Sequence, residues 1–109
     1  MMLSLAKRAG AESVSMVDLN PARLETARLI GCTAAVTSAA SLGAPRGFDV
    51  VIDCTGAEAA IRDGLTRVGR GGTYLQFGVA GYDARVAIEP YEIYRRALIL
   101  TAGQNVKDI

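Results

Sequence analysis

Short apolar runs alternate along the chain with segments in which apolar residues recur every three or four positions. Short apolar runs are typical of buried strands, and the three-to-four spacing is typical of helices that pack one face on a core. Between them, segment 38–47 is small and polar, which predicts a loop. The predicted strands are 14–17, 34–36, 49–53, 71–79 and 98–101, and the predicted helices are 2–9, 21–30, 57–68 and 91–96.

Residues at the ends of these segments support the helix boundaries. Asn20 is suited to cap a helix N-terminus, and Pro21 fits the first helical position, where its missing N–H costs nothing. Gly10, Gly31 and Gly69 follow predicted helices, and glycine is the usual residue at a helix C-terminus.

The alternation of strands and helices predicts an α/β fold. Buried strands joined by helices form a parallel sheet covered on both faces, the doubly wound class. Ligands of such sheets bind beyond the carboxyl ends of the strands. Asp18 and the segments 54–56 and 78–80 lie at these ends, so we expect the site there.

Composition limits the function. The 109 residues suit one domain, and 12 basic against 11 acidic side chains provide no electrostatic footprint for nucleic acid or an anionic membrane. The sequence contains no apolar run of the roughly 20 residues that a membrane span needs, and the apolar stretch in its opening is shorter than that of a signal sequence. We therefore expect a cytoplasmic protein with small-molecule or protein partners.

The sequence contains no catalytic constellation that we can identify. It has no histidine, which excludes Ser/His/Asp and Cys/His arrangements, and its two cysteines, Cys32 and Cys54, are too isolated for a disulfide framework or a zinc site. We expect both thiols to be reduced and largely buried. Four tyrosines are possible proton donors by composition, but none has a lysine at helical spacing: Tyr74, Tyr82, Tyr91 and Tyr94.

Asp18 follows the first predicted strand and leads through Leu19 into a helix. A carboxylate at this position can accept two hydrogen bonds from the hydroxyls of an adenosine ribose, and its charge repels the extra phosphate of NADP. Asp18 would therefore favour NAD. The alternative is a plain loop or cap residue. Arg23 could lie beside the adenine or ribose in company with Asp18, or be an ordinary solvated arginine.

Two further segments offer backbone to a ligand. After the strand at 49–53, Gly56 would allow a cofactor or a helix to approach closely, while Thr55 fits either ligand contact or a helix N-cap. The segment FGVAG at 77–81 offers amide groups without bulky side chains, which suit a nicotinamide carboxamide or a simple turn.

No stretch of the sequence resembles a phosphate-binding turn. In dinucleotide-binding folds this glycine-rich turn precedes the ribose carboxylate by about 20 residues, and from Asp18 that distance ends just before Met1. Gly69, Gly71 and Gly72 follow a helix and precede a strand, the reverse of the required order. We expect the first strand and its glycine-rich turn to lie upstream.

Three segments, AKRAGAESVSMVDLNPARLETARLIGC, FDVVIDCTGAEAAI and GRGGTYLQFGV, together resemble the cofactor-binding half of the medium-chain, zinc-type alcohol and polyol dehydrogenases. The resemblance covers nearly the whole chain. It implies an incomplete Rossmann-like domain over 1–109, with NAD as the cofactor and no bound metal. The cofactor-binding residues that it implies are Asp18, Leu19, Arg23, Cys54, Thr55, Gly56, Phe77, Gly78 and Val79, with a looser match near Gln104 or Asn105.

The same resemblance implies what this chain lacks. In the family, zinc, the substrate pocket and the proton relay belong to a separate domain, so we expect the isolated chain to be a truncated, inactive part of an enzyme that passes a hydride between an alcohol or polyol and NAD. Without the first strand of the order 3-2-1-4-5-6, the second and fourth strands would flank a gap with exposed edges. The last strand, at 98–101, is the expected homodimer interface.

Two alternatives remain at this point. A methyltransferase using S-adenosylmethionine also has an acidic residue after its second strand, and it would place an antiparallel hairpin at the end of the chain. A non-catalytic nucleotide-sensing or interaction module is the other alternative, and it requires the chain to be stable by itself.

Overall fold

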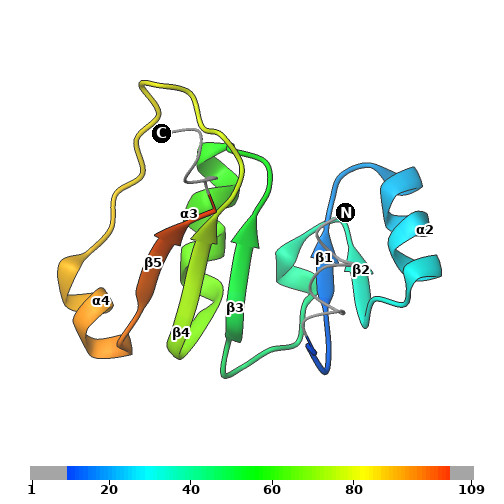
Figure 1. Cartoon of the computed structure of the whole chain (residues 1–109), viewed down its shortest axis with the longest axis horizontal. Helices are drawn as coiled ribbons and strands as arrows, with labels where there is room; N and C mark the ends of the chain where they lie inside the picture. The colour runs from blue at the N-terminus through cyan, green and yellow to red at the C-terminus, as the bar shows by residue number, and fades with distance from the viewer. Residues whose placement is uncertain (1–9, 104–109) are drawn as a thin grey trace. The chain divides into compact units, whose positions relative to one another are not determined.

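The computed structural model describes residues 10–103, which form an α/β arrangement (Figure 1). The predicted helix at 2–9, Gln104 and Asn105 lie outside these residues. The chain divides into two compact units, Met1–Gly43 and Ala44–Ile109.

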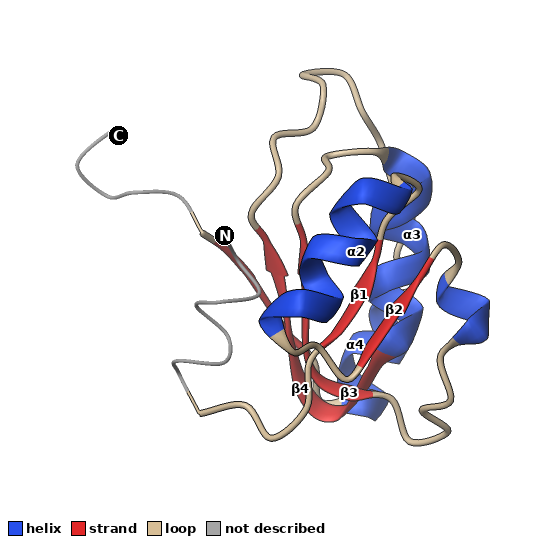
Figure 2. Cartoon of the chain, turned by 90° about the vertical axis from the view of Figure 1, so that its right-hand side faces the viewer, coloured by secondary structure: helices blue, strands red, loops and turns tan. Residues whose placement is uncertain are grey.

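The first unit contains a pair of parallel strands joined by a helix. β1 (Ser15–Val17) pairs with β2 (Ala34–Val36) in register, and α2 (Pro21–Ile30) packs on both strands (Figure 2). Leu24 and Ala27 bury the inner face of α2. A short 3₁₀ turn, η1 (Ala39–Ser41), lies within the predicted loop.

The ends of α2 confirm the sequence prediction. Asn20 caps the N-terminus, and its side-chain oxygen accepts hydrogen bonds from the backbone N–H groups of Ala22 and Arg23 at 2.9 and 3.3 Å. Gly31 ends the helix in the left-handed conformation at φ +98°, which glycine adopts without steric penalty.

The second unit is a three-stranded parallel sheet with two helices. Its order is β3-β4-β5, so that the central strand is β4 (Val68–Gln76), flanked by β3 (Phe48–Asp53) and β5 (Ile99–Ala102). α3 (Glu58–Arg67) packs on β3 and β4, and α4 (Pro90–Arg96) precedes β5.

The core of this unit lies between α3 and the sheet. Ile61, Val68 and Tyr74 are buried there, with Val51 and Leu98 among the half-buried apolar residues packed around them. The core thus fixes α3 against the strands whose carboxyl ends the sequence marks as the site.

The limits of β4 differ from the prediction. The strand begins at Val68 instead of Gly71, because Val68 already pairs with Phe48 before the register shifts at a bulge. It ends at Gln76 instead of Val79, because the N–H groups of Phe77 and Gly78 both turn to the carbonyl oxygen of Asp53, at 3.0 and 2.8 Å.

Every strand pair in the described residues is parallel, which confirms the predicted class. The two sheets run β2-β1 and β3-β4-β5. These orders equal the portions 3-2 and 4-5-6 of the dinucleotide-binding order. The parallel pairing of β4 with β5 disagrees with the antiparallel hairpin of the methyltransferase alternative. No helix within the described residues is long and apolar enough to cross a membrane.

Candidate functional site at the strand ends

Asp18 lies directly after β1, where its backbone N–H donates to the carbonyl oxygen of Val36 at 3.1 Å. One carboxylate oxygen, Oδ1, accepts a hydrogen bond from the N–H of Asn20 at 2.9 Å, and Oδ2 lies 2.9 Å from Nε of Arg23. The two contacts fix the orientation of the carboxylate. Because each oxygen accepts two hydrogen bonds, capacity remains for an incoming pair of hydroxyls.

Arg23 is therefore paired with Asp18, an ion pair that the sequence analysis did not predict. Its side chain is 65% exposed and that of Asp18 is 19% exposed, so the pair lies at the surface. Leu19 separates the carboxylate from the helix and is 84% exposed. A large apolar side chain next to a fixed carboxylate is compatible with contact to the flat face of a base.

Asp53, at the end of β3, is a buried carboxylate, whereas the sequence pattern predicts it only as part of a strand. Its residue is 7% exposed. Oδ1 accepts a hydrogen bond from the hydroxyl of Thr55 at 2.8 Å. Oδ2 accepts hydrogen bonds from the N–H of Gly56 at 2.8 Å and from Nε2 of Gln76 at 2.7 Å.

Opposing effects act on the pKa of Asp53. Burial by itself raises the pKa of a carboxyl group, but the hydrogen bonds from Gly56, Gln76 and Thr55 stabilise the charged form and together bring the pKa of Asp53 below its ordinary value. The group is thus ionised at neutral pH. Perturbed titratable groups cluster at functional sites, but this shift depends in part on Gln76, which is 23 residues away, so the sequence alone carries no signal for it.

The segments after β3 and β4 lie backbone against backbone. A methyl group on Gly56 would clash with the carbonyl oxygen of Val79, and one on Gly78 would be 2.6 Å from the backbone nitrogen of Gly56. Gly56 also has φ +75°, which favours glycine. The two segments can therefore touch each other only because both residues are glycines. This requirement exists whether or not a ligand approaches Gly56.

The predicted backbone donors at 77–79 are partly occupied. The N–H groups of Phe77 and Gly78 donate to Asp53, so the expectation of exposed amides is wrong for these two residues. Val79 is 92% exposed, and its N–H has no acceptor among the described residues. Among residues 77–79, the donor left to a ligand is therefore that of Val79.

Thr55 has a different role from the expected N-cap. The N-cap of α3 is Ala57, which makes no side-chain capping bond. The hydroxyl of Thr55 donates to Asp53 and accepts the N–H of Ala57 at 3.1 Å. Thr55 therefore shapes the turn before the helix.

The prediction that the Cys54 thiol is largely buried was wrong. Cys54 is exposed and Cys32 is half-buried. Successive residues of a strand point to opposite sides, and Asp53 takes the inward position, so its neighbour Cys54 points outward. Partial desolvation by neighbouring groups, and then the charge of Asp53, raise the pKa of the Cys54 thiol. This thiol is not activated as a nucleophile.

Tyr74 is a buried member of the Asp53 network and not a proton donor for a substrate. Its hydroxyl donates to Oε1 of Gln76 at 2.7 Å, and burial followed by the charge of Asp53 raises the pKa of Tyr74 to about 12. Tyr82, Tyr91 and Tyr94 are exposed.

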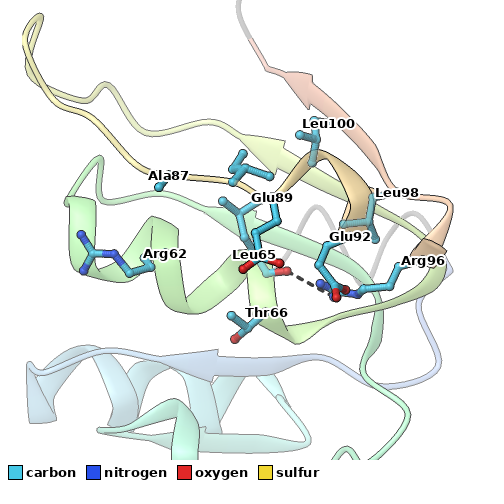
Figure 3. Close-up of a pocket in the computed structure, with 10 residues that line it drawn as sticks. Arg62, Leu65, Thr66, Ala87, Glu89, Glu92, Arg96, Leu98 and Leu100 are labelled. Atoms are coloured by element: carbon cyan, nitrogen blue, oxygen red, sulfur yellow. Dashed lines mark hydrogen bonds between the residues drawn. The ribbon is translucent and has the colours of Figure 1, made fainter. Parts of the chain in front are cut away.

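The surface hollows of the second unit lie away from these residues. One, of about 350 Å³, is lined by Leu65, Leu98 and Leu100 together with Glu92 and Arg96, and Arg96 donates across it to the carbonyl oxygen of Leu65 at 3.2 Å (Figure 3). A second, of about 410 Å³, adjoins Arg46 and Arg70. No predicted site residue lines either hollow.

The predicted residues thus form two groups. Asp18, Leu19 and Arg23 belong to the first unit, and Cys54 to Gly56 meet Phe77 to Val79 in the second. The first group contains an oriented carboxylate, and the second contains glycine backbones in close contact. Within residues 10–103 no group of three or more His, Cys, Asp or Glu side chains could hold a metal ion, so these residues do not fit zinc.

The sequence profile described as zinc-binding dehydrogenase matches residues 1–104. The chain belongs to the zinc-binding dehydrogenase family. D-altritol 5-dehydrogenase of Agrobacterium fabrum is 39% identical over 105 residues, which are 95% of this chain and 31% of that enzyme. L-threonine 3-dehydrogenase of Alteromonas mediterranea is 32% identical over 108 residues, which are 92% of this chain and 31% of that enzyme.

Solved zinc-binding dehydrogenases share the fold. One from Sinorhizobium meliloti, bound to NADP, is 28% identical with a TM-score of 0.85, and the match covers 92% of this chain and 32% of that one. Another, from Clostridium scindens, is 28% identical with a TM-score of 0.82, covering 93% and 31%. The chain therefore spans about a third of the length of these zinc-binding dehydrogenases.

Proposed function

We propose that this chain is part of the nucleotide-binding domain of a dehydrogenase that passes a hydride between an alcohol or polyol and NAD. The observation that carries the proposal is the carboxylate of Asp18, held after β1 by Asn20 and Arg23. A fixed carboxylate in this position binds the vicinal hydroxyls of a ribose.

The proposed preference for NAD over NADP follows from the ion pair between Arg23 and Asp18. An arginine near this position accommodates the 2′-phosphate of NADP when it is available for it. Here Nε of Arg23 lies 2.9 Å from Asp18, and the carboxylate stands where a 2′-phosphate would meet like charge. These contacts support NAD, although the Sinorhizobium meliloti relative was solved with NADP.

The second unit would serve the nicotinamide end of the cofactor. Its support is the N–H of Val79, which has no acceptor among the described residues, beside the close contact of Gly56 and Gly78. We place zinc and the substrate pocket in a part of the enzyme other than residues 10–103, because these residues hold no metal-ligand cluster. The relatives named for D-altritol and L-threonine support a small hydroxylated substrate.

The test begins with the gene that encodes this chain. We expect its reading frame to specify a longer polypeptide with a glycine-rich turn, and the purified product to reduce NAD in the presence of an alcohol or polyol. The 109-residue chain itself should show little or no NAD binding and no turnover. Micromolar affinity of this chain for NAD would contradict the proposal, as would a reading frame that contains nothing more.

We further propose a homodimer formed through β5. All four residues of this strand are exposed, including Ile99 at 56% and Leu100 at 39%, and its ladder in the described residues is with β4 alone. An exposed apolar edge favours pairing with another strand. Sedimentation of the unsubstituted chain should show a dimer, and Ile99→Lys should convert it to a monomer. Val79→Lys places the same charge at another exposed position and should leave the dimer intact. A monomeric unsubstituted chain would refute the proposed homodimer.

A further inference from the structure

Asp53 is a buried charged residue whose carboxylate lies between the segments that follow β3 and β4. We infer that Asp53 is a positioning residue, which holds the turn at Gly56 directly and the turn at Gly78 through Gln76, and so fixes the edge that faces the cofactor. What this edge binds rests on the proposed function. The positioning itself is a property of the chain without ligand.

The direct hold is on the segment after β3. The N–H of Gly56 donates to Oδ2 at 2.8 Å and the hydroxyl of Thr55 donates to Oδ1 at 2.8 Å. Both donors come from the turn that leads into α3. Hydrogen bonds to a charged acceptor are shorter and stronger than neutral ones, so this turn is held firmly.

The indirect hold is on the segment after β4. Nε2 of Gln76 donates both to Oδ2 of Asp53 at 2.7 Å and to the carbonyl oxygen of Gly78 at 2.9 Å. The hydroxyl of Tyr74 donates to Oε1 of the same amide at 2.7 Å and thereby fixes which end of it faces Asp53. Gln76 is thus a brace between the two segments.

Backbone contacts leave little room for either segment to move alone. The carbonyl oxygen of Asp53 accepts the N–H groups of Phe77 and Gly78, and the two glycines meet at a distance that excludes a methyl group. A shift of one turn would displace the other. The N–H of Val79 lies one residue beyond this contact, so its direction depends on the same hydrogen bonds.

A purely structural role does not explain the choice of residue. An apolar side chain in a core is often as stabilising as a buried charge, which pays a desolvation penalty. Here Gly56, Thr55 and Gln76, the donors to the carboxylate, lie in or beside the turns beyond the strand ends. The carboxylate therefore organises the turns at this edge of the sheet.

Amide hydrogen exchange on the 109-residue chain tests the inference without nucleotide. We expect Asp53→Ala to raise the exchange rates of Gly56, Phe77 and Gly78 by about tenfold or more, while the amides within β4 change by less than about twofold. Asp49→Asn, at an exposed position near the start of the same strand, is the matched control and should leave all these rates unchanged.

Asp53→Asn separates positioning from charge. Its side-chain oxygen can accept from Gly56 and Gln76, and its NH₂ can donate to the hydroxyl of Thr55, so it should restore slow exchange. Gln76→Leu removes the brace, and with it the acceptor of the Tyr74 hydroxyl, but leaves the hydrogen bonds from Gly56 and Thr55 to Asp53 in place. It should therefore speed exchange at Gly78 more than at Gly56. This variant provides the test if Asp53→Ala does not fold.

Three results would overturn the inference. A uniform rise along β3, β4 and β5 in Asp53→Ala would show a contribution to global stability only. Failure of Asp53→Asn to restore slow exchange would show that hydrogen-bond geometry is not the cause, and fast exchange at Gly56 and Gly78 in the unsubstituted chain would show that the turns are not held. Failure of NAD binding in the longer polypeptide would instead refute the proposed function alone.

Discussion

Nε of Arg23 lies 2.9 Å from Oδ2 of Asp18, across the turn that joins β1 to α2. The Arg23 side chain of this pair is exposed to solvent, and exposed ion pairs contribute about 0–1 kcal/mol to the free energy of unfolding. A contact that adds so little stability still orients a carboxylate. We therefore expect Asp18 to matter for nucleotide choice far more than for folding.

Asp18→Ala in the longer enzyme should weaken NAD binding by about 10- to 100-fold, the usual cost of losing hydrogen bonds to a charged group. It should also leave Arg23 available for the 2′-phosphate of NADP and narrow the preference between the two cofactors. Fluorescence titration with each cofactor measures both effects. Arg28→Ala removes an exposed arginine from the same helix and serves as control. An unchanged NAD affinity in Asp18→Ala would refute the ribose role.

Gly78→Ala should destabilise the second unit. The added methyl group would lie 2.6 Å from the carbonyl carbon of Cys54 and the backbone nitrogen of Gly56, and backbone cannot move away as a side chain can. Overpacking of this kind costs about 1–3 kcal/mol. Urea denaturation measures the loss. Gly81→Ala, where the methyl group makes only an ordinary contact at 3.6 Å, should differ from the unsubstituted chain by less than about 0.5 kcal/mol.

Local signals allowed parts of this fold to be predicted from the sequence. The capping residues of α2 act within one turn of the helix, so Asn20 and Gly31 could be read directly. The position of Asp18 at a strand end, five residues before Arg23 in the first turn of the next helix, could also be predicted locally, but the ion pair between the two side chains was not predicted. Predictions of this kind need no knowledge of distant neighbours.

The Asp53 network could not be read in the same way. Gln76 is 23 residues away in sequence and meets Asp53 only because β3 and β4 pair in register. The same pairing decides that Phe77 and Gly78 turn toward Asp53, which ended β4 early and occupied two of the predicted donors. The outward position of Cys54 follows from the inward one of Asp53.

Tyr74 should resist ionisation. Because burial and the charge of Asp53 raise the pKa of Tyr74 to about 12, its phenolate should form well above the ordinary value of 10. The difference in tyrosinate absorbance between the chain and Tyr74→Phe should therefore develop only toward pH 12. Tyr82→Phe, which removes a fully exposed ring, gives the reference curve, and circular dichroism checks that the fold persists. If the absorbance difference between the unsubstituted chain and Tyr74→Phe were already complete near pH 10, Tyr74 would not be part of a buried network.

The stability of the second unit should fall in acid because of Asp53. Its pKa in the folded chain lies below the ordinary value of 3.8, so the ionised form is favoured by folding. The contribution of this carboxylate is fully present above the unfolded pKa and is lost as the pH falls through the lower folded pKa.

Urea denaturation at a series of pH values measures this loss. The difference in free energy of unfolding between the unsubstituted chain and Asp53→Asn should be constant near neutral pH and should shrink below about pH 4. Asp49→Asn removes an exposed carboxylate near the start of β3 and gives the reference for the loss of one negative charge. A difference that stays constant or grows in acid would mean that the hydrogen bonds from Gly56, Thr55 and Gln76 do not outweigh the cost of burying the charge.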